Sequence, residues 1–392
     1  MTADLGYYSA NGKKFTNKIQ AILEAQTNLS DVTWDFHCDI FNRINWQEEP
    51  LLSLDALYKI RAQQIRDDYD YVIIMCSGGA DSTNVVKTFL NNNIHIDEII
   101  GSAPMSGLNN WNWNDKDTSV SNTISETKYA LFPLLNEIAT SFPNIKITIN
   151  DYFEDITKYQ TDKWLYECLD WVNPVINAKG DLNKFKHLKD LAEQGKRIAI
   201  VWGIDKPIIR YNNDGSLCTL ITDLGVNNAV QPFDKDYPNV SRVIFYWGPE
   251  LPEMLVKQSH AVAKFIHKKE NLWLTDLVKQ MGGVKLWHED RIQEASTAKG
   301  DYQRSIVPAI YPTTYDNVFQ CQKSTISFLS PQHDWFNILH KGTHIHQMVE
   351  SDFKLFYKNI HPKYLGSNKN SFITFRQRYN IGHYTKFMEI AT

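Results

Sequence analysis

The chain has 392 residues, which is enough for two domains or for one large α/β domain with additions. Its 41 Lys and Arg residues and 45 Asp and Glu residues give a formal net charge of −4 at pH 7, so overall charge provides no argument for binding nucleic acid or an anionic membrane. No apolar run approaches the length of a membrane span, and residues 1–15 lack the apolar core of a signal peptide, so we expect no membrane partner.

The first strong signal for regular structure comes after residue 50. Residues 51–66 have apolar side chains at helical spacing, and we predict that residues 1–68 form a helical N-terminal extension. Residues 71–75 are a short apolar run rich in β-branched side chains, followed directly by a turn with two glycines and by a helix from about Ser82. A buried strand, a tight turn and a helix are therefore predicted in direct succession.

Strands and helices alternate over the next part of the chain. A second strand should end near Ser102, and further strands are predicted at residues 145–151 and 197–202, with helices at 121–142, 156–171 and 182–194. This alternation predicts an α/β domain at residues 69–250, with a mostly parallel twisted sheet and helices on both faces. Residues 208–223 predict a hairpin around an Asn-Asp-Gly turn, and residues 251–392 predict a mainly helical C-terminal region that starts near Pro252.

The turn between the first strand and its helix has the composition of an anion-binding loop. Glycine lets the main chain bend sharply and approach a ligand closely. The N–H groups and the positive dipole end of the following helix point into the turn. Ser77 and Ser82 add hydroxyl donors, and Asp81 is placed to hold a metal ion that bridges phosphates. We therefore predict that this loop binds phosphate groups.

The loop lacks the Walker pattern GxxxxGK[ST], and GxGxxG is absent from the chain. Its sequence, SGGADS, resembles the SGGxDS signature of the PP-loop ATP pyrophosphatases, which include the synthetase domain of asparagine synthetases. The resemblance implies an adenine nucleotide alpha hydrolase-like fold with ATP and Mg²⁺ as cofactors. It also implies an enzyme that cleaves ATP between the α and β phosphates, transfers AMP to a substrate oxygen and lets a nucleophile displace the AMP. The alternative is a glycine-rich turn that arose by chance between a strand and a helix.

The resemblance assigns roles to residues at the ends of the first two strands predicted in the α/β domain. It implies that ATP is bound by the loop residues Ser77, Gly78, Gly79, Ala80, Asp81 and Ser82. PP-loop proteins commonly meet adenine and ribose at the end of the second strand through main-chain groups. Ser102 and Ala103 are therefore expected to contact the nucleotide, although a simple exit from the strand would explain them equally well.

The segment GIDKP, residues 203–207, is the second candidate for catalysis because it follows a predicted strand. Ligands of parallel sheets lie at the carboxyl ends of the strands, which is where both SGGADS and GIDKP are predicted to lie. In asparagine-synthetase-like proteins a strand after the nucleotide loop ends in a Gly-containing turn whose acidic residue helps to hold magnesium. Asp205 has a similar position, although the residues around it do not match that pattern, and we predict Asp81 and Asp205 as metal ligands. Lys206 would stabilise negative charge on the pyrophosphate or in the transition state. The alternative is an ordinary strand-end turn in which Pro207 stops the strand.

Other features of the sequence indicate which members of the PP-loop family the chain resembles. Position 2 is Thr, where full asparagine synthetases have a cysteine nucleophile, and only residues 1–68 precede the α/β domain, so we expect no glutaminase domain. The five cysteines form no CxxC pair, which favours reduced thiols and a cytoplasmic protein, and the redox cysteine motif of the sulfate-activation reductases is missing. The sequence around the loop is similar to stand-alone asparagine-synthetase-like proteins of bacteriophages. It implies a ligase that joins an amine or ammonia to an activated small-molecule substrate, in the host cytoplasm if the protein is encoded by a phage.

Two clusters near the end of the chain leave alternatives open. His340 and His344 are four residues apart and would share a helix face, the spacing of a two-histidine metal site, and His346 follows shortly after. A cluster of surface or partly buried histidines is the more ordinary explanation. Basic and aromatic residues alternate over residues 363–386, a pattern that suits either a nucleic-acid contact or a solvated face. The alternative functions are therefore a PP-loop enzyme that modifies a base of tRNA or phage DNA, and a non-catalytic nucleotide-binding module.

Overall fold

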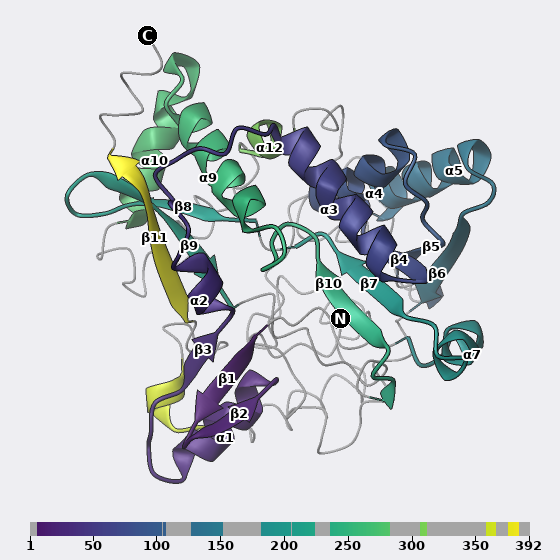
Figure 1. The fold of residues 1–392 in the computed structure, drawn as a ribbon, viewed down its shortest axis with the longest axis horizontal. Coiled ribbons are helices and arrows are strands. Elements are labelled where there is room, and N and C mark those ends of the chain that lie inside the picture. The colour runs from purple at the N-terminus through teal and green to yellow at the C-terminus, as the bar shows by residue number, and fades with distance from the viewer. Residues whose placement is uncertain are drawn as a thin grey trace.

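A computed structural model describes residues 6–103, 105–106, 127–151, 182–204, 206–223, 236–282, 306–311, 358–365 and 375–383. In this part of the chain there is a five-stranded parallel sheet and there are two three-stranded antiparallel sheets (Figure 1). The described helices include none with the length and apolar character that crossing a membrane requires.

The five-stranded sheet has the order β10-β7-β4-β5-β6, and every neighbouring pair is parallel. Its strands are β4 (Tyr71–Cys76), β5 (Glu98–Ala103), β6 (Lys146–Asp151), β7 (Ile198–Trp202) and β10 (Val240–Ile244). Strands β5 and β6 follow one another on one side of β4, and the chain then continues with β7, which pairs with the other side of β4. The strand order therefore reverses between β4 and β7. In open α/β sheets, ligands bind outside the carboxyl ends of the strands at such a point.

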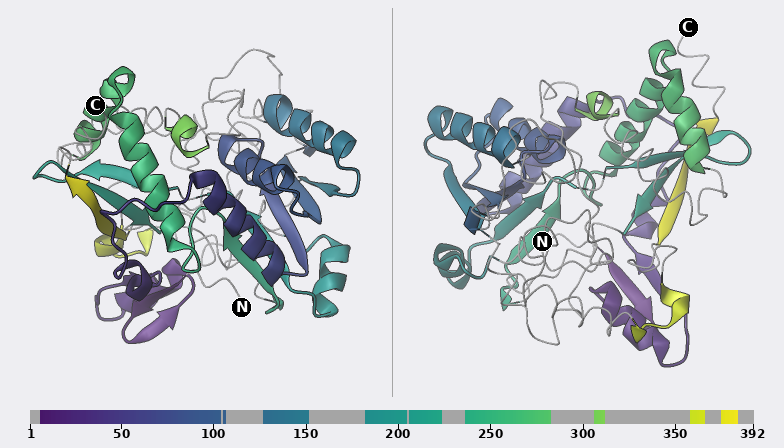
Figure 2. Two further views of the ribbon diagram at one scale, coloured as in Figure 1. Left: turned by 45° about the horizontal axis from the view of Figure 1, so that its top comes forward. Right: turned by 180° about the vertical axis from the view of Figure 1, so that it is seen from behind.

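Helices cover both faces of this sheet. Alternate residues of β4 point to opposite faces, and residues 72–76 are buried, as expected for a strand between two layers of helices. Val72, Ile74 and Cys76 belong to the apolar layer that includes α3, α4 and α5, whereas Ile73 and Met75 belong to the layer that includes α7. These helices are α3 (Leu54–Asp68), α4 (Ala80–Asn91), α5 (Phe132–Ser141) and α7 (Lys186–Glu193). Figure 2 shows α3 lying along the sheet in a second view.

The predicted α/β class with helices on both faces of a parallel sheet is confirmed, and all five strands of that sheet are parallel. The helix after β4 begins at Ala80, two residues before its predicted start. The hairpin predicted at residues 208–223 is also present, as β8 (Ile208–Tyr211) paired antiparallel with β9 (Ser216–Thr222). The predicted helix at residues 156–171 lies outside the described residues.

Residues 6–68 differ from the predicted helical extension. They begin with an antiparallel sheet of β1 (Tyr7–Ala10), β2 (Lys13–Phe15) and β3 (Thr33–Asp35), and continue with α1 (Lys18–Gln26), α2 (Cys38–Phe41) and α3. The sequence gives little sign of these strands because they have only three or four residues, too few for a clear alternation of apolar and polar side chains.

The described part of residues 251–392 contains helices and one strand. The helices are α9 (Pro252–Ile266), α10 (Leu272–Gly282) and α12 (Val307–Ile310), with 3₁₀ turns at Lys269–Asn271 and Pro362–Tyr364. Strand β11 (Arg376–His383) pairs antiparallel with β9, so the third sheet has the order β11-β9-β8. The predicted mainly helical region therefore also contributes a strand to a sheet that begins far earlier in the chain.

Candidate active site

The predicted phosphate-binding loop is the turn between β4 and α4. Gly78 has a φ of +79°, which L side chains rarely adopt. A Cβ atom on Gly78 would lie 2.4 Å from the main-chain nitrogen of Leu131, at the end of the π-helix η2 (Thr127–Leu131). Backbone conformation and close packing therefore independently require glycine at position 78.

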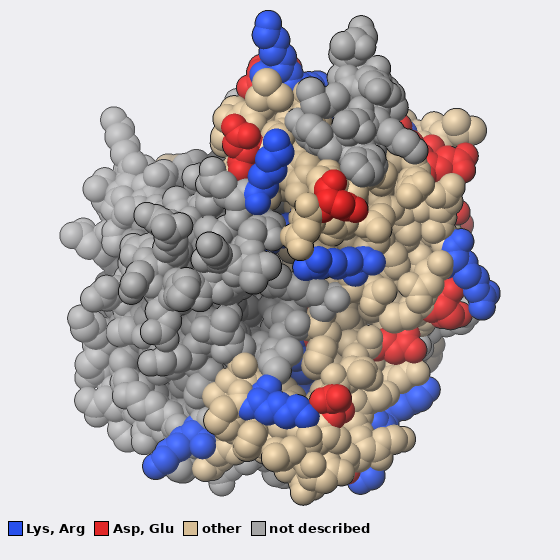
Figure 3. Space-filling view, turned by 90° about the vertical axis from the view of Figure 1, so that its left-hand side faces the viewer, with Lys and Arg blue, Asp and Glu red and all other residues tan. Residues whose placement is uncertain are grey.

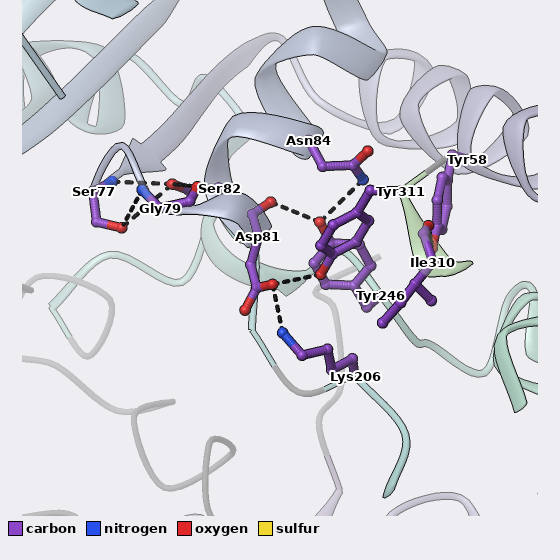
Figure 4. Close-up of polar contacts among 10 residues, drawn as sticks. All are labelled: Tyr58, Ser77, Gly79, Asp81, Ser82, Asn84, Lys206, Tyr246, Ile310 and Tyr311. Atoms are coloured by element: carbon purple, nitrogen blue, oxygen red, sulfur yellow. Dashed lines mark hydrogen bonds and ion pairs between the residues drawn. The ribbon is translucent and has the colours of Figure 1, made fainter. Parts of the chain in front are cut away.

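Two serines hold this turn in shape (Figure 4). The main-chain N–H of Ser77 donates to Ser82 Oγ (3.2 Å), and the hydroxyl of Ser82 donates to the carbonyl oxygen of Gly79 (3.2 Å). The N–H of Gly79 donates to Ser77 Oγ at 3.3 Å. Ser82 is buried and Ser77 is exposed, so the Ser82 hydroxyl, predicted as a phosphate donor, stabilises the turn in this structure.

The N-terminus of α4 faces the same turn. Its N-cap residue is Gly79, and within the described chain no side chain caps the helix. The first N–H groups of a helix have no partner within the helix, and they give its N-terminus a partial positive charge. A turn closed by serines and backed by an uncapped helix N-terminus is suited to holding an anionic group.

The turn after β7 packs against the first turn of α4. Met75 of β4 lies opposite Trp202 of β7, so both strands end at the same edge of the sheet. A Cβ atom on Gly203 would lie 2.9 Å from the carbonyl oxygen of Asp81, so glycine allows the two turns to approach closely. The structure thus brings together the two segments that the sequence analysis selected.

An ion pair joins these two turns. The ammonium group of Lys206 lies 2.6 Å from Asp81 Oδ1, and the two side chains are 15% and 35% exposed, respectively. A positive and a negative group therefore lie together beside the uncapped helix N-terminus. Asp205, predicted as a metal ligand and catalytic residue, lies outside the described residues. No cluster of three His, Cys, Asp or Glu side chains that could hold a metal occurs among the described residues.

Asp81 also contacts two buried tyrosines that the sequence analysis missed. The hydroxyl of Tyr311 donates to Asp81 Oδ1 at 2.6 Å, and the hydroxyl of Tyr246 donates to the carbonyl oxygen of Asp81 at 2.6 Å (Figure 4). Asn84 Nδ2 in turn donates to the hydroxyl oxygen of Tyr246 at 3.1 Å. These residues come from α4, from the segment after β10 and from the segment after α12, so no local sequence pattern could have grouped them.

A third buried tyrosine, Tyr58 of α3, supports this cluster. Its hydroxyl donates to the carbonyl oxygen of Ile310 at 2.9 Å, and its ring lies 5.8 Å from the ring of Tyr246. Burial raises the pKa of Tyr58, Tyr246 and Tyr311 well above the usual value of 10, and the nearby Asp81 carboxylate adds to this effect. The three phenols therefore remain neutral hydrogen-bond donors at physiological pH.

These raised tyrosine pKa values predict a loss of stability in alkali. The free energy of unfolding should fall as pH rises above about 10, because unfolded tyrosines release protons there and the buried ones do not. Below about pH 10 these tyrosines are protonated in both the folded and the unfolded protein, so they add no pH dependence to the free energy of unfolding. Urea unfolding at about pH 9 and about pH 10.5 measures the decrease, which should be smaller in Tyr246→Phe. An equal decrease in the variant and the parent protein would contradict this prediction.

The remaining predicted nucleotide contacts lie at the same edge of the sheet. Ser102 and Ala103 end β5, and Ala103 lies opposite Asp151 at the end of β6. Ala103 is buried and Ser102 is partly exposed, and Asp151 Oδ2 accepts a hydrogen bond from the N–H of Ser106 at 2.8 Å. The hydrogen bonds found among the described residues do not connect Ser102 or Ala103 to Asp81 and Lys206. Their predicted contact with the nucleotide stays a prediction.

The C-terminal clusters are only partly described. His340, His344 and His346 lie outside the described residues. Lys363, part of the basic and aromatic segment, forms an ion pair with Asp31 at 2.9 Å and donates to the carbonyl oxygen of Ser30 at 3.2 Å. On the face shown in Figure 3, the described Lys and Arg residues are interspersed with Asp and Glu. The described surface there therefore lacks the single-sign patch expected for nucleic-acid binding.

We compared the chain with models of protein families, with curated proteins and with solved structures, and these comparisons found no match. The functional assignment therefore depends on the loop sequence, the strand order of the sheet and the contacts around Asp81.

Proposed function

We propose that this protein is an ATP-dependent ligase of the PP-loop type, which transfers AMP from ATP to a substrate oxygen with release of pyrophosphate, so that an amine or ammonia then displaces the AMP. The main support is the position of the SGGADS turn. It follows the strand at which the order of the parallel sheet reverses, where α/β sheets bind ligands. The Asp81–Lys206 pair lies at the same edge.

The residues at this edge fit a triphosphate with its divalent cation. The uncapped N-terminus of α4 offers main-chain N–H donors, and Lys206 adds a positive charge. The carboxylate of Asp81 is a hard oxygen ligand of the kind that Mg²⁺ prefers, and it is partly exposed. When bound, ATP would supply the adenylyl group and the pyrophosphate leaving group.

Different residues of the site would bind the phosphate groups, bind the cation and stabilise the leaving group. The turn at residues 77–79 and the helix N-terminus behind it would hold the phosphate oxygens. Asp81 would hold the cation. The ammonium group of Lys206 would stabilise the negative charge that develops on the departing pyrophosphate, since a positioned cation lowers the energy of such a transition state. Asp205 remains the predicted second metal ligand.

The products formed from ATP test this proposal. Purified protein is incubated with ATP, Mg²⁺, L-aspartate and ammonium, and then with other carboxylates and amines in place of the last two. We expect AMP and pyrophosphate in equal amounts, and an acceptor-dependent exchange of labelled pyrophosphate into ATP. Formation of ADP and orthophosphate would contradict the proposed reaction, and nucleotide binding without any product would favour the non-catalytic module.

Substitution of Lys206 tests the role of the turn after β7. Lys206→Met should lower the rate of AMP formation by about 10²-fold, the usual effect of removing one group that stabilises developing charge. Lys186→Met is the control, because Lys186 lies on α7, is 86% exposed and pairs only with Asp190 among the ion pairs described. Initial rates at saturating ATP measure both variants. A wild-type rate for Lys206→Met would remove Lys206 from the mechanism.

A further inference from the structure

Tyr311 connects the C-terminal part of the chain to the nucleotide loop. Its hydroxyl donates to Asp81 Oδ1 at 2.6 Å, across a sequence separation of 230 residues. Tyr311 is only 1% exposed, whereas the Asp81 side chain is 35% exposed, so a buried phenol contacts a carboxylate that solvent can still reach. The orientation of the Asp81 carboxylate therefore depends on more than the SGGADS loop, because a residue from a distant segment of the chain donates a hydrogen bond to Oδ1.

Tyr311 is itself held in place by its neighbours. Its ring lies 5.4 Å from the ring of Tyr246, whose hydroxyl donates to the main chain of Asp81. The hydroxyl of Tyr58 donates to the carbonyl oxygen of Ile310, the residue before Tyr311. Figure 4 shows these side chains grouped on the side of Asp81 away from Ser77 and Gly79. The Tyr311 phenol thus has little freedom to move away from the carboxylate.

Two donors of different charge share Asp81 Oδ1. Lys206 contributes an ammonium group, whereas Tyr311 contributes the hydroxyl of a buried phenol. A neutral donor can orient a carboxylate without repelling a cation that the same carboxylate binds. Carboxylates that bind metals are commonly oriented by hydrogen-bond donors, and loss of such a donor typically weakens metal binding by about 10- to 100-fold.

We propose that Tyr311 is a positioning residue, which holds the Asp81 carboxylate in the orientation needed to bind the divalent cation that accompanies the nucleotide. This rests on the part of the proposed function in which Asp81 binds a divalent cation with the nucleotide, and it does not depend on the reaction that follows. The Tyr311 hydroxyl contacts Asp81 and acts through it.

The test is cation binding, measured apart from turnover. Tyr311→Phe removes the hydroxyl and keeps the ring. The probe is Mn²⁺, whose free concentration is followed by electron paramagnetic resonance in the presence of an ATP analogue with a methylene group between the α and β phosphorus atoms. We expect Mn²⁺ to bind Tyr311→Phe about 10-fold more weakly than the parent protein. We expect an equal or larger loss in Asp81→Asn.

Tyr379→Phe is the matched control. Tyr379 is also buried, at 6% exposure, and within the described structure its hydroxyl has no hydrogen-bond partner. The control therefore loses a buried hydroxyl without changing Asp81, and it should bind Mn²⁺ as the parent protein does. Should Tyr311→Phe not fold, the parent protein supplies a second readout. Adding Mg²⁺ and the analogue should change the near-ultraviolet absorption of buried tyrosine, and Asp81→Asn should abolish the change.

The outcomes separate this inference from the proposed reaction. Weaker Mn²⁺ binding by Tyr311→Phe supports the inference even if the parent protein forms no AMP from ATP, a result that would count against the ligase alone. Unchanged Mn²⁺ binding by Tyr311→Phe overturns the inference, whether or not the enzyme is active. A parent protein that binds no Mn²⁺, or that shows no tyrosine absorption change with Mg²⁺, overturns it as well.

Discussion

Replacing Asp81 with Asn should lower the rate of AMP formation by about 10³-fold or more while the protein stays folded. The amide keeps an oxygen that can accept hydrogen bonds from Lys206 and Tyr311, so the contacts around position 81 can persist. It loses the negative charge that binds a hard divalent cation. A bound cation contributes several kcal/mol to stabilising charge at a reacting phosphate, and each factor of ten in rate corresponds to about 1.4 kcal/mol.

Initial rates of AMP release and circular dichroism spectra measure the two parts of this prediction. The control is Glu253→Gln, because Glu253 is also an acidic residue in the first turn of a helix, α9, and it is exposed. A rate near that of the parent protein for Asp81→Asn would show that Asp81 does not bind the catalytic cation. The proposed mechanism would then lose one of its two predicted metal ligands.

The central sheet and the loop could be predicted because their signals are local. A run of β-branched residues at 71–75, two adjacent glycines and a helical pattern define strand, turn and helix within about twenty residues. The meeting of SGGADS with GIDKP also followed from a general rule, since parallel strands leave a sheet at the same edge. The contact between Gly203 and the main chain of Asp81 agrees with that reasoning.

The tyrosines around Asp81 could not be predicted, because nothing in their spacing relates them to the loop. Tyr246 follows β10 and Tyr311 follows α12, and each reaches Asp81 only after the chain has folded. The pairing of β11 with β9 is non-local in the same way. Ser82 was predicted to donate to phosphate, but its hydroxyl donates to the carbonyl oxygen of Gly79, a bond that depends on how tightly the turn closes. Sequence patterns thus gave the scaffold and charged groups of the site, and tertiary packing determined how they are held.

Gly78→Ala should destabilise the protein by about 2–5 kcal/mol. A left-handed backbone costs a residue with a Cβ atom about 1–2 kcal/mol, and forcing extra atoms into a packed region costs about 1–3 kcal/mol more. The new methyl group would meet the main chain of Leu131, which cannot move aside as a flexible side chain could. Because folded proteins are stable by only about 5–15 kcal/mol, this is a large fraction of the total.

Gly215→Ala separates the two causes. Gly215 has a φ of +81°, close to that of Gly78, but a Cβ atom there would meet nothing within 4 Å. This variant should therefore lose only the backbone part, about 1–2 kcal/mol, and urea unfolding of both variants measures the difference. An equal loss in the two would mean that η2 can move away from the turn at little cost. The larger loss in Gly78→Ala would show that the turn is held against η2, and folded Gly78→Ala should then also bind ATP more weakly, because its main-chain donors would be displaced.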